Sequence, residues 1–278
     1  MLFLLLAILS SAAIAILMRI SSARISANLS MLAVNYLVCS LLGMAYTGFS
    51  PAVPTDSGFF FTLWMGVFSG FLYLGGFVLC QYNTRKRGVV LTSIFMKLGL
   101  LVPVILSLLL FGEIPGISQI IGFCIAVFAI VLINLKVECS SSGFGWSLLL
   151  MLLMCGGSDA MAKVFEKLGP AELSDSYLFY CFVTAFLLCA GLVLFRKEKP
   201  GFPELLFGTL IGIPNFFSAK FLLGALTELP AVVVYPSFSV ATILIVTLSG
   251  VIVFRERLNK MQWFALAAII TALVFLNI

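Results

Sequence analysis

The chain contains no histidine, and charged residues make up only 10% of its 278 positions. Without histidine there is no His-based acid–base pair or catalytic triad and no usual zinc site. No glycine-rich phosphate loop precedes a Lys-Ser or Lys-Thr pair, so nothing indicates ATP hydrolysis. We therefore expect a protein that is not an enzyme and that has no cofactor.

Cysteine is present but follows no pattern. The seven cysteines have no paired spacing and fall mostly within apolar stretches. We interpret them as small apolar residues in a reduced or lipid environment. They are Cys39, Cys80, Cys124, Cys139, Cys155, Cys181 and Cys189.

Long apolar runs dominate the chain, which is 62% hydrophobic. About 20 apolar residues cross the hydrocarbon layer as a helix, and lipid cannot hydrogen-bond a bare backbone, so each run must be helical. Ten runs are present, at 2–18, 29–47, 59–82, 89–110, 116–135, 144–165, 174–195, 202–226, 231–254 and 261–278. The predicted fold class is an all-α integral membrane protein with ten transmembrane helices.

A repeat divides these helices into two sets of five. Sliding residues 88–135 by 143 positions onto residues 231–278 gives ten identities in 48 positions. The polar identities are Glu113 with Glu256, Gln119 with Gln262 and Asn134 with Asn277. Duplicated membrane proteins are usually transporters. We predict one membrane domain made of a first repeat at 1–138 and a second at 139–278.

The charges indicate that the second repeat is inverted. Five helices is an odd number, so a second copy must insert upside down. Lys and Arg gather in cytoplasmic loops. The loops after predicted helices 1, 3, 7 and 9, with the central linker, hold twelve of them, and the other loops hold two. We therefore predict an inverted-topology repeat with cytoplasmic basic loops and both chain ends outside.

The first residues agree with this orientation. Met1-Leu2-Phe3 has no positive flank, whereas Arg19 and Arg24 follow the first predicted helix. A cleaved signal peptide is the alternative, but it requires a basic leading segment. We expect a multi-pass protein of the plasma (inner) membrane, whose basic face reflects topology and anionic lipid and not nucleic acid.

Two stretches resemble the EamA-type signature of the drug/metabolite transporter superfamily. The first is Leu110-Phe111-Gly112-Glu113 with Gln119 and Gly122, and the second runs from Leu229-Pro230-Ala231 through Pro236 to Phe254-Arg255-Glu256-Arg257-Leu258 and Gln262. The resemblance covers the whole chain. It implies a 5+5 inverted repeat, a central cavity lined by helices 1, 3, 4, 6, 8 and 9, and proton-coupled or exchange transport of small metabolites. Family members are usually described with cytoplasmic termini, which differs from the orientation predicted here.

Three charged residues fall within predicted membrane helices, where an unpaired charge is costly. The helical rise places Lys97 about 14 Å deep, and Asp159 and Lys220 at a shared depth of about 22–24 Å. We therefore predict an ion pair between Asp159 and Lys220, with one cluster of all three residues, or Asp159 paired with Lys163, as alternatives. Lys97, with no acid at its level, is predicted to bind an anionic group of the substrate or to carry a transported proton.

Small and polar residues complete the candidate site. Gly156-Gly157-Ser158 predicts a weak spot in helix 6 where backbone groups are freed for a ligand. Gly66 and Gly70 predict a close helix contact, and Asn35 predicts an interhelical hydrogen bond. The candidate substrate-binding residues are Lys97, Lys220, Asp159, Tyr73, Ser93, Asn215 and Tyr235.

Together these features predict a secondary active transporter for a small anionic or zwitterionic, amino-acid-like metabolite, working by alternating access. The alternatives are efflux of cationic drugs, which needs a carboxylate on helix 1 where only Ser10 and Ser11 are polar, and a lipid-handling flippase. The expected partners are the small-molecule substrate, the lipid bilayer and protons as a candidate coupling ion. Nucleic acid is not expected, and a homodimer is left open.

The charge asymmetry gives a test of topology. Single cysteines at Lys86 and Lys197, in a cysteine-free background, should resist a membrane-impermeant thiol reagent in intact cells and react after permeabilisation, because both loops are expected to face the cytoplasm. Labelling of both positions in intact cells would reverse the orientation.

Overall fold

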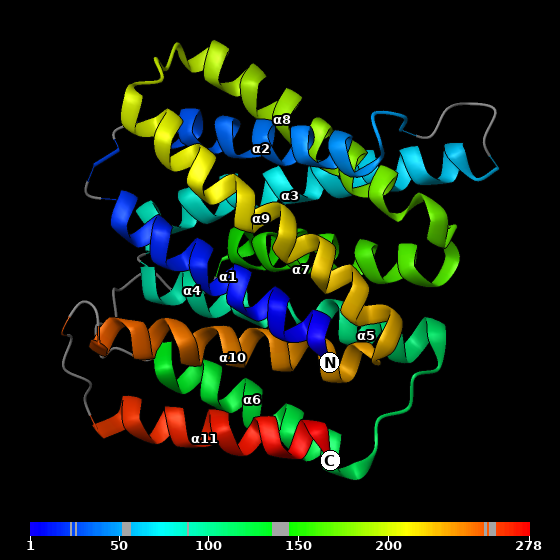
Figure 1. Cartoon of the computed structure of the whole chain (residues 1–278). Coiled ribbons are helices and arrows are strands. Elements are labelled where there is room, and N and C mark those ends of the chain that lie inside the picture. Colours follow the sequence, from blue (N-terminus) through cyan, green and yellow to red (C-terminus); the bar gives the residue numbers. More distant parts are fainter. Residues whose placement is uncertain are drawn as a thin grey trace. The chain divides into compact units, whose positions relative to one another are not determined.

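The computed structural model describes residues 1–22, 24–25, 27–51, 57–87, 89–134, 145–252, 255 and 260–278, and all regular structure in these ranges is helical (Figure 1). The elements are α1 (Leu2–Ser21), α2 (Asn28–Tyr46), α3 (Phe59–Arg87), α4 (Val89–Leu98), α5 (Leu101–Phe111), α6 (Ile117–Asn134), α7 (Trp146–Leu168), a 3-10 turn (Ala171–Leu173), α8 (Ser174–Arg196), α9 (Phe202–Glu228), α10 (Ala231–Ile252) and α11 (Lys260–Asn277). The predictions that involve Lys136, Cys139 and Glu256 fall outside the described residues.

The predicted membrane helices are confirmed. Within the described residues, nine segments are long and apolar enough to cross a bilayer, with α4 and α5 together forming one of them, Leu91–Phe111. The shorter apolar helix Ile117–Leu132, within α6, corresponds to the tenth predicted run. The protein is an integral, multi-pass membrane protein.

The helices form two compact units, each built from both halves of the chain. Unit 1 comprises Met1–Leu74 and Val164–Ala225, and unit 2 comprises Gly75–Lys163 and Leu226–Ile278. Within unit 1, α2 packs along α8, and within unit 2, α6 packs along α11 (Figure 1). Each pair joins helices at equivalent positions of the two predicted repeats. The boundary at 138–139 stays a prediction.

The backbone repeats as well as the sequence. Gly112, which ends α5, has a φ of 63°, and Arg255, which lies 143 positions later, has a φ of 55°. Glycine adopts this left-handed conformation freely, whereas other residues rarely do. The same turn therefore follows the fourth helix of each repeat, even where the second copy has an arginine.

Helix 4 of the first repeat is broken where the sequence predicted one continuous helix. Pro103 has no N–H, and its ring crowds the carbonyl four residues earlier, which belongs to Gly99. The backbone responds with three-residue hydrogen bonds: Leu100 N–H donates to Lys97 O at 3.4 Å and Val102 N–H to Gly99 O at 3.0 Å. The helix is therefore divided at Gly99 and Leu100, between the end of α4 at Leu98 and the start of α5 at Leu101.

The weak spot predicted in helix 6 was wrong. Helix α7 runs without interruption through Gly156-Gly157-Ser158. A Cβ at Gly156 would lie 2.7 Å from Val102 Cγ2 and would also meet the carbonyl oxygen of Gly99. Gly156 therefore lets α7 approach the break in the opposite helix, and it does not break its own helix.

In unit 1, by contrast, the close contact predicted for Gly66 and Gly70 is confirmed. A Cβ at Gly66 would lie 2.6 Å from Tyr180 Cβ, and one at Gly70 would lie 2.8 Å from Thr184 Cβ. Both neighbours belong to α8. Small residues bring membrane helices together in this way.

Gly156→Ala should destabilise the protein by about 1–3 kcal/mol, because the added methyl group strikes backbone that cannot move aside. Gly191→Ala is the matched control, since a Cβ at that exposed position on α8 meets nothing within 4 Å. It should be neutral or stabilising by about 0.5–1 kcal/mol. Thermal unfolding in detergent compares the two, and equal behaviour would contradict the packing role of Gly156.

Candidate functional site

Two opposite charges in unit 2, Lys97 and Asp159, interact electrostatically. Lys97 lies in the last turn of α4, Asp159 lies on α7, and both side chains are half-buried. Each lies within electrostatic range of the other, yet among the described residues they form no direct ion pair. The C-terminal end of α4 also favours a positive charge in its last turn.

Helix packing explains why these two residues meet. Gly156 lies against Gly99, two residues after Lys97, and Asp159 follows Gly156 by three positions on α7. Residues three apart share a helix face, so the face of α7 that contacts the break also carries Asp159. Lys97, for which helical rise predicted no acid at its level, therefore has Asp159 within electrostatic range, because helical rise alone ignores the tilt and rotation of each helix.

Lys220 has a different partner from the one predicted. Its Nζ pairs with Asp175 Oδ1 at the start of α8 and lies 4.2 Å from the centroid of the Tyr46 ring. All three residues belong to unit 1. The predicted Asp159–Lys220 pair and the cluster of Lys97, Lys220 and Asp159 were therefore wrong.

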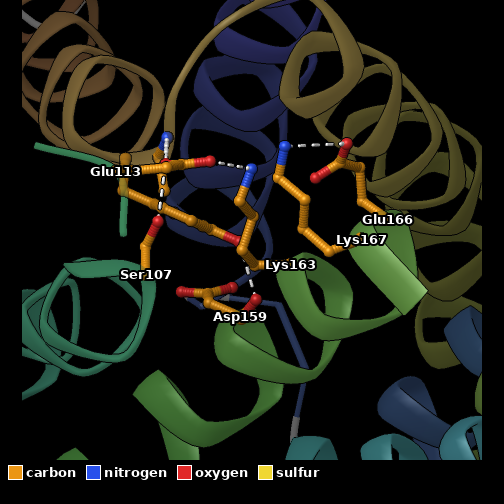
Figure 2. A network of polar contacts seen from close by, with 8 residues as sticks. Ser107, Glu113, Asp159, Lys163, Glu166 and Lys167 are labelled. Carbon is orange, nitrogen blue, oxygen red and sulfur yellow. Dashed lines mark hydrogen bonds and ion pairs between the residues drawn. The ribbon is translucent and has the colours of Figure 1, made fainter. Parts of the chain in front are cut away.

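A second charge network in unit 2 centres on Glu113 (Figure 2). Lys163 Nζ lies 2.8 Å from Glu113 Oε1, and the Lys163 side chain is fully buried. Ser107 Oγ donates to Glu113 Oε2 at 2.5 Å, and the Ala231 N–H donates to the same oxygen at 2.9 Å. One carboxylate therefore joins α5, α7 and the first residue of α10. The alternative that paired Lys163 with Asp159 is replaced by this Glu113 pair.

The surroundings of Glu113 keep it ionised. Burial alone would raise the pKa of the carboxyl, but the hydrogen bonds from Lys163, Ser107 and Ala231 and the Lys163 charge outweigh it, so the pKa lies below its ordinary value. A carboxylate at the N-terminus of α10 also complements the helix dipole.

A second contact ties α7 to α10 one turn away. Tyr235 is buried, and its hydroxyl donates to the backbone oxygen of Asp159 at 2.6 Å. Tyr235 follows Ala231 by four positions, and Asp159 precedes Lys163 by four. Two successive turns of α7 are therefore bound to two successive turns of α10.

The remaining candidates divide between the units. Ser93 is half-buried on α4, one turn before Lys97 in unit 2. In unit 1, Asn215 Nδ2 donates to Asn35 Oδ1 at 3.2 Å, which confirms the predicted interhelical role of Asn35. Tyr73 packs edge-on against Tyr36, with ring centroids 6.1 Å apart. Four of the seven candidates thus belong to unit 2 and three to unit 1.

The sequence interpretation did not assign the Glu113–Lys163 pair or Asp175. The repeat had marked Glu113 as a residue shared by both copies, which was the available signal. Lys163 was placed with the loop charges after helix 6, although α7 extends beyond it to Leu168.

Comparisons with known proteins agree with the repeat. The profile of the EamA-like transporter family matches the chain twice, over residues 1–135 and 142–278. An uncharacterized protein of Haemophilus influenzae is 24% identical over 283 residues, covering 95% of this chain and 94% of that protein. A solved structure, titled only as a crystal structure of a protein, shares the fold with a TM-score of 0.74 at 15% identity, covering 99% of this chain and 94% of that one.

Glu113→Gln should destabilise the protein by on the order of 3 kcal/mol, because it leaves the buried Lys163 charge without its carboxylate. Adding Lys163→Met should recover much of the loss. Glu172→Gln, at an exposed position, is the control and should cost less than about 1 kcal/mol. A double variant no more stable than Glu113→Gln would contradict the pairing.

The lowered pKa of Glu113 also predicts a pH dependence. Its contribution to stability is complete above the unfolded-state pKa of about 4.3 and is lost as the pH falls through the lower folded-state value. Thermal unfolding between neutral and acidic pH should therefore show that Glu113→Gln loses less stability at acidic pH than the parent does. An unchanged pH profile would exclude Glu113 as a contributor.

Proposed function

Because the chain belongs to the EamA-like transporter family, and is therefore a membrane transporter and not an enzyme, we propose that it carries a small zwitterionic, amino-acid-like metabolite by alternating access. The observation that carries this proposal is the pair of half-buried, opposite charges, Lys97 and Asp159, which lie within electrostatic range of each other and, among the described residues, form no direct ion pair.

The opposite signs of the two charges favour a zwitterion over a simple ion. A buried charge is costly unless it meets an opposite charge or polar groups. A ligand with both a carboxylate and an ammonium group satisfies Lys97 and Asp159 together. A purely anionic ligand brings like charge towards Asp159, and a purely cationic one brings like charge towards Lys97, and such repulsion is strong where water is scarce.

The broken helix supports a binding role at this place. Carriers commonly hold their substrate near the membrane midplane, beside discontinuous helices whose ends supply backbone groups and dipoles. Here the break at Gly99 lies two residues after Lys97. Ser93, one turn before Lys97, adds a hydroxyl on the same face of α4.

The charge pattern supports the proposed orientation, and the family resemblance supports the proposed coupling. We place the protein in the plasma (inner) membrane with the basic loops in the cytoplasm and both termini outside. Transport is coupled to protons or proceeds by exchange. Efflux of cationic drugs is the alternative within transport, and Lys97 argues against it because it repels a cation. A flippase is the other alternative.

A charge-matched ligand series tests the cargo class. An amino acid, its methyl ester and its N-acetyl derivative carry a zwitterion, a cation and an anion on the same side chain. Across a panel of such triplets, the thermal shift of the purified protein should be larger for at least one amino acid than for either of its two derivatives. Stabilisation by the N-acetyl compounds equal to that by the amino acids would favour an anionic cargo and overturn the zwitterion.

Variants at the two charges should then shift the preference in opposite directions. Lys97→Met should weaken binding of the amino acid but not binding of its methyl ester, because the repulsion of the cation is removed. Asp159→Asn should spare the N-acetyl anion. Both variants should lose uptake of the amino acid in proteoliposomes, whereas Lys199→Met, at an exposed position, should keep it. Normal uptake by Lys97→Met would exclude Lys97 from the site.

A further inference from the structure

An ion pair in unit 1 lies among aromatic rings. Lys220, on α9, and Asp175, in the first turn of α8, form the pair, with side chains 26% and 32% exposed. The Lys220 ammonium group lies 4.2 Å from the centroid of the Tyr46 ring, a cation–π distance. Both charges are thus held in place and still accessible.

The rings form a continuous series beside this pair. The Tyr46 ring centroid lies 5.4 Å from that of Phe216 and 5.9 Å from that of Phe217. Phe217 stacks on Phe221 at 5.6 Å, and Phe221 stacks on Phe3 at 6.3 Å. Tyr46 is 46% exposed and Phe3 is 39% exposed, so the series has accessible ring surface next to the charges.

Exchange of partners at Lys220 is energetically accessible. An ion pair between partly exposed groups contributes little to stability, so a second carboxylate can compete with Asp175. The Tyr46 ring holds the ammonium group from the other side during such an exchange. A planar ring attached to the incoming carboxylate gains stacking with the aromatic side chains.

We infer that Lys220, Tyr46 and Phe217 form a binding site for a carboxylate joined to a planar aromatic ring. The carboxylate binds Lys220 and the ring packs on Tyr46 and Phe217. Where the ligand also carries an ammonium group, this group binds the released Asp175. The inference rests on the proposed function in one respect: it assigns this ligand class to the cargo. The site belongs to unit 1, whereas Lys97 and Asp159 belong to unit 2.

Binding is measured by calorimetry in detergent, in a Lys97→Met background that removes the proposed site in unit 2. The probes are 3-phenylpropionate, phenylalanine and 3-cyclohexylpropionate. In this background 3-phenylpropionate should bind and its cyclohexyl analogue should bind several-fold more weakly, since it lacks a planar ring. Adding Lys220→Gln should weaken binding of 3-phenylpropionate about tenfold, and Tyr46→Leu or Phe217→Leu should remove the preference for the planar ring.

Asp175→Asn separates binding from a structural role. It should leave binding of 3-phenylpropionate unchanged or make it tighter, because a competing carboxylate is gone. It should weaken binding of phenylalanine, because the ammonium group of phenylalanine loses its partner. Lys199→Gln, an exposed lysine of the same unit, is the control and should change neither. Parallel weakening of both ligands by Asp175→Asn would show that the pair only anchors the helices, as aromatic and charged residues often do at membrane interfaces.

Two further results would overturn the site. If Lys220→Gln binds 3-phenylpropionate as well as its background, Lys220 is not the anchor. If no binding survives in Lys97→Met while the parent binds and transports, the ligand is held at Lys97 alone, and the proposed function stands without this second site. Loss of transport in Lys97→Met with intact calorimetric binding is the result expected when both proposals are correct.

Discussion

The arrangement of unit 2 depends on the Glu113 carboxylate. The buried ammonium group of Lys163 requires an opposite charge, and Glu113 provides it while accepting hydrogen bonds from Ser107 and the first residue of α10. The left-handed turn at Gly112 directs the chain so that Glu113 can do this. Because Lys163 follows Asp159 by one turn, the same interaction sets the rotation of α7 and hence the side to which Asp159 projects.

The candidate site follows from backbone constraints as much as from charge. Pro103 removes the N–H that would bond to the Gly99 carbonyl in a continuous helix, α4 ends at Leu98, and Gly156 allows α7 to approach that break. Lys97 is then stabilised by the end of α4 and by Asp159 at longer range. Among the described residues, no direct ion pair joins these two charges. A direct ion pair would have favoured a structural role.

The sequence was sufficient to predict the features that depend on composition and on the spacing of residues along the chain. Lipid leaves helices as the solution for long apolar runs, so ten spans could be predicted, and the paired Glu113 and Glu256 pointed to duplication. It was insufficient for the partners of Lys220 and Asp159. Helical rise gives depth along a straight axis, whereas partners also depend on tilt and rotation. Asp175 lies in the first turn of α8, and spacing along the chain gave no sign that it reaches Lys220.

By itself, then, the sequence determined that the chain lies in lipid, the number of membrane-spanning segments, the repeat and the charged residues within the membrane. Each of these follows from hydrophobicity and spacing along the chain. Only the tertiary structure decided which charges meet. It paired Lys163 with Glu113 and Lys220 with Asp175, and it left Lys97 and Asp159 near each other without contact. The reason is physical: small residues such as Gly156 decide how closely two helices approach, and that distance is encoded in packing between segments far apart in the chain.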